Sequence, residues 1–326
     1  MSSVAAMATG AAISAVPRGA HAQHQAPTRR IGVLFGGGFS TQSPEAQQFR
    51  RGLLDAGYVE GRDVVIEWRS ARGDYDRVPA LAADLIQRKV EVIVVTTTVA
   101  AMAVKRTTST IPIVMALVAD PVGSGLVASL AHPGGNVTGL SMMMGDLTAK
   151  RLQLLKEAIP RLTQVAVLWS PDIPFHRKGV EDLKAAAPPL AIALNFMSAR
   201  TPAEFAPAFS AIARAHAQAL YVLDTPLFFT HRTTLLKLTS KARLPAIYSY
   251  SQWADEGGLM SYGANSADLI RRSAGYVDKI LKGANPSDLP IEQPSKFEFV
   301  VNLRTARAIG ITIPESVLAR ADEVIR

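Results

Sequence analysis

The sequence predicts an α/β protein with two doubly wound parallel-sheet lobes and a ligand cleft between them. Short runs rich in Val and Ile alternate with helical segments, and near-continuous apolar strands of this kind are typical of parallel sheets covered on both faces. The alternation occurs twice along the 326 residues, which is enough chain for two domains of ordinary size. Hydrophobic residues make up 48% of the chain and charged residues 19%, so the composition favours a folded core over disorder.

The order of the elements supports this two-lobed fold. The first series predicts strands at 31–35, 64–68, 90–96 and 111–118, with helices over 44–56, 78–88 and 99–107. The second predicts helices over 147–159, 175–187, 203–216 and 233–241, with strands at 165–169, 193–197, 219–224 and 245–248. The series divide near HPGGNVTGLS (132–141), and a helix over 268–281 and the strand KFEFVVNL (296–303) remain. We interpret these two as the chain crossing back between the lobes.

Five segments follow the expected strands directly. They read GGGFST (36–41), TTTVA (96–100), VADPVGSG (118–125), SPDIPF (170–175) and DTPLFF (224–229). Ligands of open α/β sheets bind outside the carboxyl ends of the strands, so two facing lobes would gather these loops around one cleft. This geometry is typical of a receptor that closes about a hinge.

Charge, cysteine content and the first residues narrow the class of protein. The chain has 35 basic and 27 acidic residues, a net charge of +8, but no dense basic block, so we expect no nucleic-acid partner. Without cysteine it forms no disulfide. Residues 1–22 are interpreted as a signal peptide, with Ala20 and Ala22 at the cleavage site and Gln23 starting the mature chain. A basic n-region is missing, so either the true start lies upstream of Met1 or this segment is not a signal.

Enzyme motifs are largely missing from the sequence. The glycine loop at 36–38 lacks the Gly-Lys-Ser/Thr of a P-loop and the later glycine of a dinucleotide fingerprint. The six histidines show no metal-ligand spacing, and we expect them at the surface or at helix ends. Asp120 and Asp224 end strands, where carboxylates can do acid–base work, but a nearby proline makes an Asx-turn equally acceptable for each. We therefore expect no catalytic residue, no metal and no cofactor.

Three long segments resemble one protein family. ADPVGSGLVASLAHPGGNVTGLS, GGLMSYGANSADLIRRSAGYVDKILKGANPSDLP and VVNLRTARAIGITIPESVLARADEVI are similar to ABC-transporter substrate-binding proteins of the tryptophan/tyrosine type. The resemblance runs from about residue 29 to the C-terminus. It implies a type I periplasmic-binding-protein fold, with two lobes joined by a three-crossing hinge, and a non-enzymatic role in solute uptake. It also implies a permease and an ATPase in the inner membrane as partners.

By analogy with that fold, the resemblance also divides the chain. The N-terminal lobe is expected to comprise 29–139 and 264–292, and the C-terminal lobe 140–263 and 293–326. The crossings would lie near 139–141, 262–264 and 293–296. We further expect a monomer, exported to the periplasm and soluble.

Hydroxyl side chains at two expected helix starts are the first candidates for a ligand clamp. Ser40 and Thr41 lie at one helix start, and Thr97 and Thr98 at another, directly after a buried strand. Hydroxyls and helix N-termini can hold a carboxylate without a formal cation. Each residue could instead only cap its helix, which is the role we favour for Ser43.

The remaining candidate ligand-binding residues come from other loops and from the crossings. Asp224, in the second lobe, would accept a ligand ammonium. In the family this aspartate is commonly followed by asparagine, whereas Thr225 follows here, which puts an α-amino-acid ligand in doubt. Phe39 and Tyr262 could wall off an apolar ligand or serve only packing. The same candidate set includes three further residues: Thr225, directly after Asp224; Asp120, at the end of a strand; and Ser141, at the first crossing.

The expected function is that of an extracytoplasmic solute receptor of an ABC importer. It would close on a small carboxylate-bearing ligand, either an amino acid or an aromatic or aliphatic acid. The alternatives are a ligand-sensing receptor that serves a separate signalling protein and, after that, an enzyme. No feature of the sequence identifies the ligand.

Overall fold

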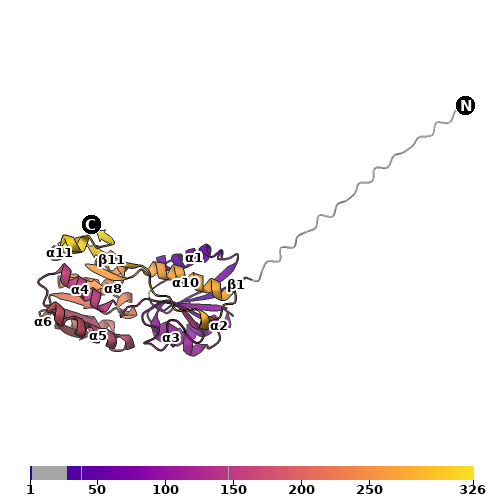
Figure 1. The fold of residues 1–326 in the computed structure, drawn as a ribbon, viewed down its shortest axis with the longest axis horizontal. Coiled ribbons are helices and arrows are strands. Elements are labelled where there is room, and N and C mark those ends of the chain that lie inside the picture. Colours follow the sequence, from indigo (N-terminus) through magenta and orange to yellow (C-terminus); the bar gives the residue numbers. More distant parts are fainter. Residues whose placement is uncertain (2–27, 38, 146) are drawn as a thin grey trace.

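The computed structural model describes Met1 and residues 28–37, 39–145 and 147–326, which form two α/β lobes side by side (Figure 1). Apart from Met1, the expected signal peptide lies outside the described residues. Among the described residues, no helix is long and apolar enough to cross a membrane.

The first lobe is a parallel sheet with helices on both faces. In the described chain its strand order is β2-β1-β3-β4-β5, and every neighbouring pair is parallel. The strands are β1 (Arg29–Phe35), β2 (Val64–Ser70), β3 (Val92–Val95), β4 (Ile113–Val118) and β5 (Val137–Ser141). The helices are α1 (Pro44–Asp55), α2 (Val78–Gln87), α3 (Thr98–Thr107) and α10 (Ser266–Leu281), with the short 3₁₀ turns η1 (Tyr75–Arg77) and η4 (Pro286–Asp288).

Alternate residues of β1 and β3 show how this sheet is covered. Ile31 and Val92 point into a core shared with α1 and α10, whereas Leu34 and Ile93 join a core shared with α2 and α3. Both faces of the strands are therefore buried, which confirms the doubly wound fold that the Val/Ile-rich runs predict.

The second lobe is built in the same way around a longer sheet of order β12-β11-β10-β9-β8-β6-β7. Its strands are β6 (Gln164–Trp169), β7 (Ala193–Ser198), β8 (Ala219–Val222), β9 (Ala246–Tyr248), β10 (Met260–Ala264), β11 (Phe297–Asn302) and β12 (Glu323–Ile325). Its helices are α4 (Thr148–Ala158), α5 (Pro174–Ala186), α6 (Phe205–Arg214), α7 (Pro226–Thr230), α8 (Arg232–Lys241), α9 (Ser251–Asp255), α11 (Leu303–Ile309) and α12 (Glu315–Leu318), with the 3₁₀ turns η2 (Pro188–Leu190) and η3 (Pro202–Glu204).

This second sheet departs from the all-parallel expectation at one pair of strands. β11 runs antiparallel to β10, whereas the other described pairs are parallel. The cause is the route of the chain: β10 leads out to the other lobe and β11 leads back from it. Adjacent strands on an outward and a return path must point in opposite directions.

Three connections join the lobes. The chain leaves the first sheet after β5, returns from β10 into α10, and leaves again before β11. The connections are hydrogen-bonded to one another: Ser141 N donates to Glu292 O at 2.9 Å, and Asn265 N donates to Lys296 O at 3.1 Å. The three connections match the three-crossing hinge that the resemblance implies.

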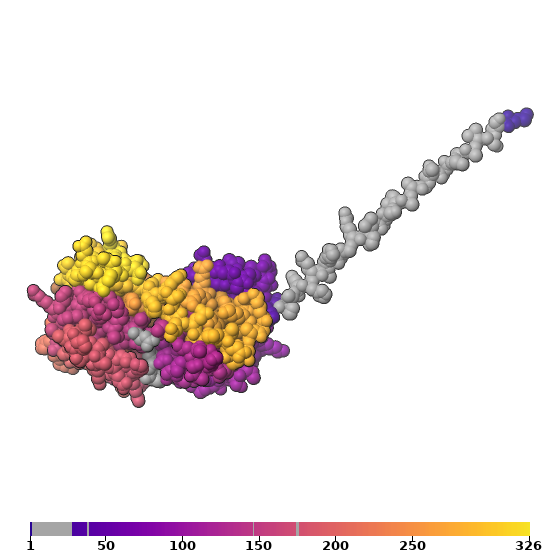
Figure 2. All heavy atoms as spheres, viewed as in Figure 1, coloured from indigo at the N-terminus to yellow at the C-terminus, as the bar shows by residue number. Residues whose placement is uncertain are grey.

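Helix α10 belongs to the first lobe although it follows most of the second lobe in sequence. Figures 1 and 2 show its orange segment against the indigo α1 of the first lobe. At their crossing, a side chain at Gly52 would collide with the carbonyl oxygen of Arg271, so only glycine allows this close approach. Arg271 Nε also donates to Asp55 Oδ2 at 2.7 Å.

Candidate functional site

A small cavity of about 40 Å³ lies between the lobes at the carboxyl ends of their strands. Parallel strands expose their carboxyl ends at one edge, so two facing sheets place these loops opposite one another. Its lining residues are Thr96, Thr97, Thr98, Val99, Leu117 and Ala119 from the first lobe, and Met144, Ile173, Asp224, Pro226 and Tyr250 from the hinge and the second lobe. The structure thus brings Thr97, Thr98 and Asp224, three of the candidate residues, to one cavity.

The three consecutive threonines share one hydrogen-bonding pattern. Thr96 Oγ1 accepts from Gly36 N at 3.3 Å, Thr97 Oγ1 from Ala100 N at 3.2 Å, and Thr98 Oγ1 from Ala119 N at 3.1 Å. Because each hydroxyl oxygen already accepts from the backbone, its proton remains to be donated, and the Thr97 hydroxyl has the Tyr75 hydroxyl as a neighbour. Thr97 caps α3 as Ser and Thr often do, and this role is compatible with a hydroxyl that also serves a ligand.

Asp224 supplies a carboxylate from the second lobe. Its Oδ2 accepts from Ser249 N at 2.7 Å, whereas its buried Oδ1 has no hydrogen-bond partner among the described residues. Burial raises the pKa of this carboxyl to about 6, because the charged form is separated from water. Oδ1 is therefore a buried acceptor, and the side chains of Ser249 and Trp253 are neighbouring donors that partly lower the pKa of Asp224.

His176 lies directly behind Asp224, and its position corrects the expectation of a surface histidine. It stands at the start of α5, as expected for a helix end, but only 1% of it is exposed. Its Nδ1 accepts from Ser170 N at 3.1 Å, which assigns the ring proton to Nε2, 3.2 Å from the carbonyl oxygen of Asp224. Burial lowers the pKa of His176 to about 4, so the ring is neutral at pH 7.

Arg151 on α4 is a second buried group that the sequence analysis missed. Only 1% of it is exposed, and its guanidinium donates to Tyr262 O at 2.7 Å, Met144 O at 3.4 Å and the Tyr221 hydroxyl at 3.3 Å. Among the described residues no carboxylate lies within 4.0 Å of it. Burial remains the main influence on the pKa of Asp224 and raises it, and the positive charge of Arg151 offsets a small part of that rise.

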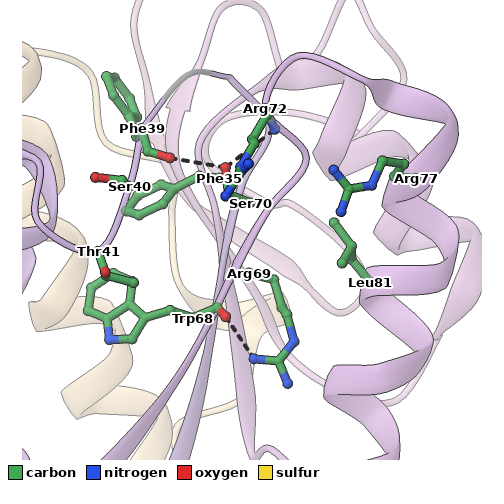
Figure 3. Close-up of a pocket in the computed structure, with 10 residues that line it drawn as sticks. All are labelled: Phe35, Phe39, Ser40, Thr41, Trp68, Arg69, Ser70, Arg72, Arg77 and Leu81. Atoms are coloured by element: carbon green, nitrogen blue, oxygen red, sulfur yellow. Dashed lines mark hydrogen bonds between the residues drawn. The ribbon is translucent and has the colours of Figure 1, made fainter.

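Phe39, Ser40 and Thr41 line a different and larger hollow of about 430 Å³, shown in Figure 3. We call it the arginine pocket, and it lies at the carboxyl ends of β1 and β2. Its lining is Phe35, Phe39, Ser40, Thr41, Trp68, Arg69, Ser70, Arg72, Arg77 and Leu81. None of these residues lines the inter-lobe cavity.

An aromatic contact between the lobes lies beside this pocket. The ring of Phe39 meets that of Phe229 on α7 edge to face, with centroids 5.8 Å apart. Phe229 in turn meets Tyr250 at 5.2 Å, and the Tyr250 hydroxyl lies 3.7 Å from the sulfur of Met144. A polar contact, Gln252 Nε2 to Glu45 Oε1 at 3.2 Å, also joins the lobes. The lobes therefore touch directly in this form.

The remaining candidate residues lie outside both hollows. Asp120 and Ser141 line a third pocket, of about 150 Å³, beside the hinge, and Asp120 Oδ1 accepts from Gly123 N at 2.8 Å as in an Asx-turn. Thr225 caps α7 by accepting from Phe228 N at 2.9 Å. Tyr262 packs on Phe297 and Phe299 in the second lobe.

Tyr250 is the residue of the inter-lobe cavity that sequence reasoning could have found. It follows β9 by two residues, and the rule that selected the other loops applies equally to that strand end. His176 and Arg151 gave no such signal, because an isolated charged residue in an amphipathic helix normally faces water.

A two-lobed α/β fold with a cavity between the lobes at the strand ends defines a solute-binding receptor. Residues 42–325 match the family model of ABC transporter substrate binding proteins, and the chain belongs to this family. The family is a substrate-binding, non-catalytic class, and its members act outside the cytoplasm.

Individual relatives agree with this assignment. The tyrosine-binding protein of Clostridioides difficile (strain R20291) is 26% identical over 263 residues, covering 81% of this chain and 75% of that protein. An ABC domain of Streptococcus pneumoniae, solved in complex with L-Trp, is 28% identical and covers 91% of this chain and 100% of its own, with a TM-score of 0.85. A conserved domain protein of Vibrio cholerae is 29% identical over 91% of this chain and 99% of its own, with a TM-score of 0.81.

Proposed function

We propose that this protein is a periplasmic receptor that captures a small carboxylate-bearing ligand between its lobes and delivers it to an ABC permease–ATPase in the inner membrane. The ligand is an amino acid or an aromatic or aliphatic acid, and it leaves unchanged. One observation carries the proposal: hydroxyl donors of the first lobe and a carboxylate of the second line the same cavity. Once the lobes part and enlarge this cavity of about 40 Å³, its two sides would offer opposite ends of a zwitterion different partners.

The side chains of each lobe suit a different end of the ligand. The protons of Thr97 and Thr98 would be donated to the ligand's carboxylate. Asp224 Oδ1 would accept from a ligand ammonium, whose positive charge would hold the pKa of Asp224 below its raised value of about 6. A ligand without an amino group would meet Asp224 as a repelling charge at neutral pH, unless the carboxyl binds a proton.

Closure would follow the hinge. In this proposal the N-terminal lobe is 29–139 with 264–292, the C-terminal lobe is 140–263 with 293–326, and a ligand held first by the threonines draws in the second lobe. Residues 1–22 would be removed on export, and the mature protein would act as a soluble monomer. The hydrogen bonds among the three connections support rotation of the lobes as rigid bodies.

A thermal-shift screen of amino acids, aromatic acids and short-chain carboxylates tests the proposal. A ligand at 100 times its Kd stabilises the folded state by roughly 2.7 kcal/mol, which such a screen detects. Small-angle scattering should then show a smaller radius of gyration with the ligand than without it, and chromatography should recover the ligand unaltered. Turnover of a bound compound would replace the receptor by an enzyme.

A further inference from the structure

We propose that the arginine pocket is a second ligand site, which binds an aromatic carboxylate in addition to the solute held between the lobes. The pocket's volume of about 430 Å³ falls within the range of small-molecule sites, roughly 300–1,000 Å³. Its lining combines aromatic side chains with arginines. The aromatic side chains would contact the ring of the ligand, and the arginines would bind its carboxylate.

The aromatic wall is a rigid surface for a planar ring. Phe35 stacks on Trp68 with centroids 5.5 Å apart and planes at 28°, and Phe39 meets Phe35 edge to face at 5.7 Å. Arg50 covers another part of Trp68 at 4.7 Å, which fixes the indole further. Rings prefer offset stacking or edge-to-face contact with such a wall.

Among the described residues, two guanidinium groups of the pocket, those of Arg72 and Arg77, form no ion pair with a carboxylate. Arg69 is neutralised, because it is bonded to Asp84 and lies 3.6 Å from Glu67. Arg72 and Arg77 form no ion pair within 4.0 Å with any carboxylate of the described residues. In Figure 3 the side chains of Arg69 and Arg77 lie on the other side of the strand ribbon from the ring of Trp68. A guanidinium matches a carboxylate with two parallel hydrogen bonds, so this side suits an anionic group.

The loop that carries Arg72 is held in place. Arg72 has a backbone φ of +54°, in the left-handed region that residues other than glycine rarely adopt. Hydrogen bonds on both sides enforce this conformation: Ala71 N donates to Phe35 O at 2.8 Å, and Gly73 N donates to Gly36 O at 3.1 Å. The cation is thus carried on backbone fixed to the end of β1, as an organised site requires.

Phe39 couples the pocket to the lobes. It lines the pocket, and its ring also meets Phe229 of the second lobe at 5.8 Å. A ligand packed on Phe39 changes the free energy of that contact, so occupancy of the pocket shifts the balance between open and closed forms.

Titration calorimetry of the full protein with benzoate as the probe tests this site. Benzoate should bind, whereas benzamide, which lacks the charge, and acetate, which lacks the ring, should not. Arg72→Gln and Arg77→Gln should each weaken benzoate roughly tenfold, since each removes a charged hydrogen-bond partner. Arg106→Gln, an exposed arginine on α3 outside the pocket, is the matched control and should leave the affinity unchanged.

Thr98→Ala separates this site from the inter-lobe cavity. If benzoate affinity falls with Thr98→Ala but not with the two arginine variants, benzoate occupies the cavity and the second site is refuted. Equal binding of benzoate and benzamide, or no binding of benzoate, also refutes it. If the arginine variants weaken benzoate while no solute is found for the cavity, the arginine pocket stands and the proposed transport function fails alone.

Discussion

Arg151 Nε donates to the carbonyl oxygen of Tyr262 at 2.7 Å, and this bond ties α4 of the second lobe to the strand that leads into the second crossing. The same guanidinium reaches Met144 O, in the first crossing, at 3.4 Å. One buried side chain therefore holds two of the three connections between the lobes.

Arg151→Met should lower the free energy of unfolding by about 2–4 kcal/mol, because buried carbonyls lose their charged donor. Chemical denaturation monitored by circular dichroism measures this. Arg161→Met, at an exposed arginine just after the same helix, is the matched control and should change stability little. Equal stability of the two variants would contradict the role given to Arg151.

Asp224 and His176 should contribute pH dependences of opposite sign. Asp224 has a folded-state pKa raised from 3.8 to about 6, so its contribution to stability is present below pH 3.8 and is lost as pH rises to 6. His176 has a folded-state pKa lowered from 6.5 to about 4, so its contribution is present above pH 6.5 and is lost as pH falls to 4. Each shift corresponds to a change on the order of 3 kcal/mol, and the two largely cancel.

Removing either titrating group should reveal the pH dependence of stability that the other group contributes. Asp224→Asn should make stability rise more steeply between pH 4 and 6 than in the unaltered protein, and His176→Gln should make it fall across the same interval. Asparagine and glutamine do not titrate in this range, and each supplies a side-chain amide that can form hydrogen bonds at the substituted position. Urea unfolding at several pH values provides the curves, and two variants whose curves run parallel to that of the unaltered protein would argue against both shifts.

Thr97→Ala and Thr98→Ala should each weaken a carboxylate ligand by roughly ten- to a hundredfold, the effect of losing a hydrogen bond to a charged group. Calorimetry with any ligand from the screen measures the affinities. Thr107→Ala serves as the control, because Thr107 Oγ1 donates to Ala103 O at 3.0 Å and does not line the cavity. Unchanged affinity in both cavity variants would place the ligand elsewhere.

Asp224→Ala should act differently on two classes of ligand. It should weaken an amino acid and hasten its release, since closure no longer gains an ammonium–carboxylate bond. For the deaminated analogue it should tighten binding, because it removes a repelling charge. Stopped-flow release rates and calorimetry on matched pairs of ligands distinguish these outcomes, and an identical effect on both members of a pair would exclude contact with the amino group.

Phe229→Leu should shift the ligand-free protein toward the open form. The edge-to-face contact of Phe229 with Phe39 contributes about 0.5–1.5 kcal/mol beyond buried area, and it exists only when the lobes meet. Small-angle scattering should show a larger radius of gyration. Phe205→Leu removes ring contacts to Phe228 and His231 within the second lobe, so its radius of gyration should stay unchanged.

Local sequence patterns predicted most of the fold, because the spacing of apolar residues reflects which faces of the strands and helices are buried. Alternating apolar runs and helices specified both sheets, and the carboxyl-end rule brought Thr98 and Asp224 to one cavity. The antiparallel β11 was not predictable from its own residues, since its direction depends on the route of the chain through the hinge. The burial of His176 and Arg151 could not be predicted either. Their partners are largely backbone carbonyl and amide groups, which leave no signal in the amino-acid sequence.

The place of α10 has a consequence for how the chain acquires its structure. The first lobe needs this helix against α1, and the bond between Arg271 and Asp55 spans 216 residues of sequence. A chain synthesised from its N-terminus cannot complete its first lobe until most of the second lobe has been made. Contacts of such long range slow folding, so the N-terminal half should remain incompletely packed, with the apolar surface that α10 covers still exposed, until late in synthesis.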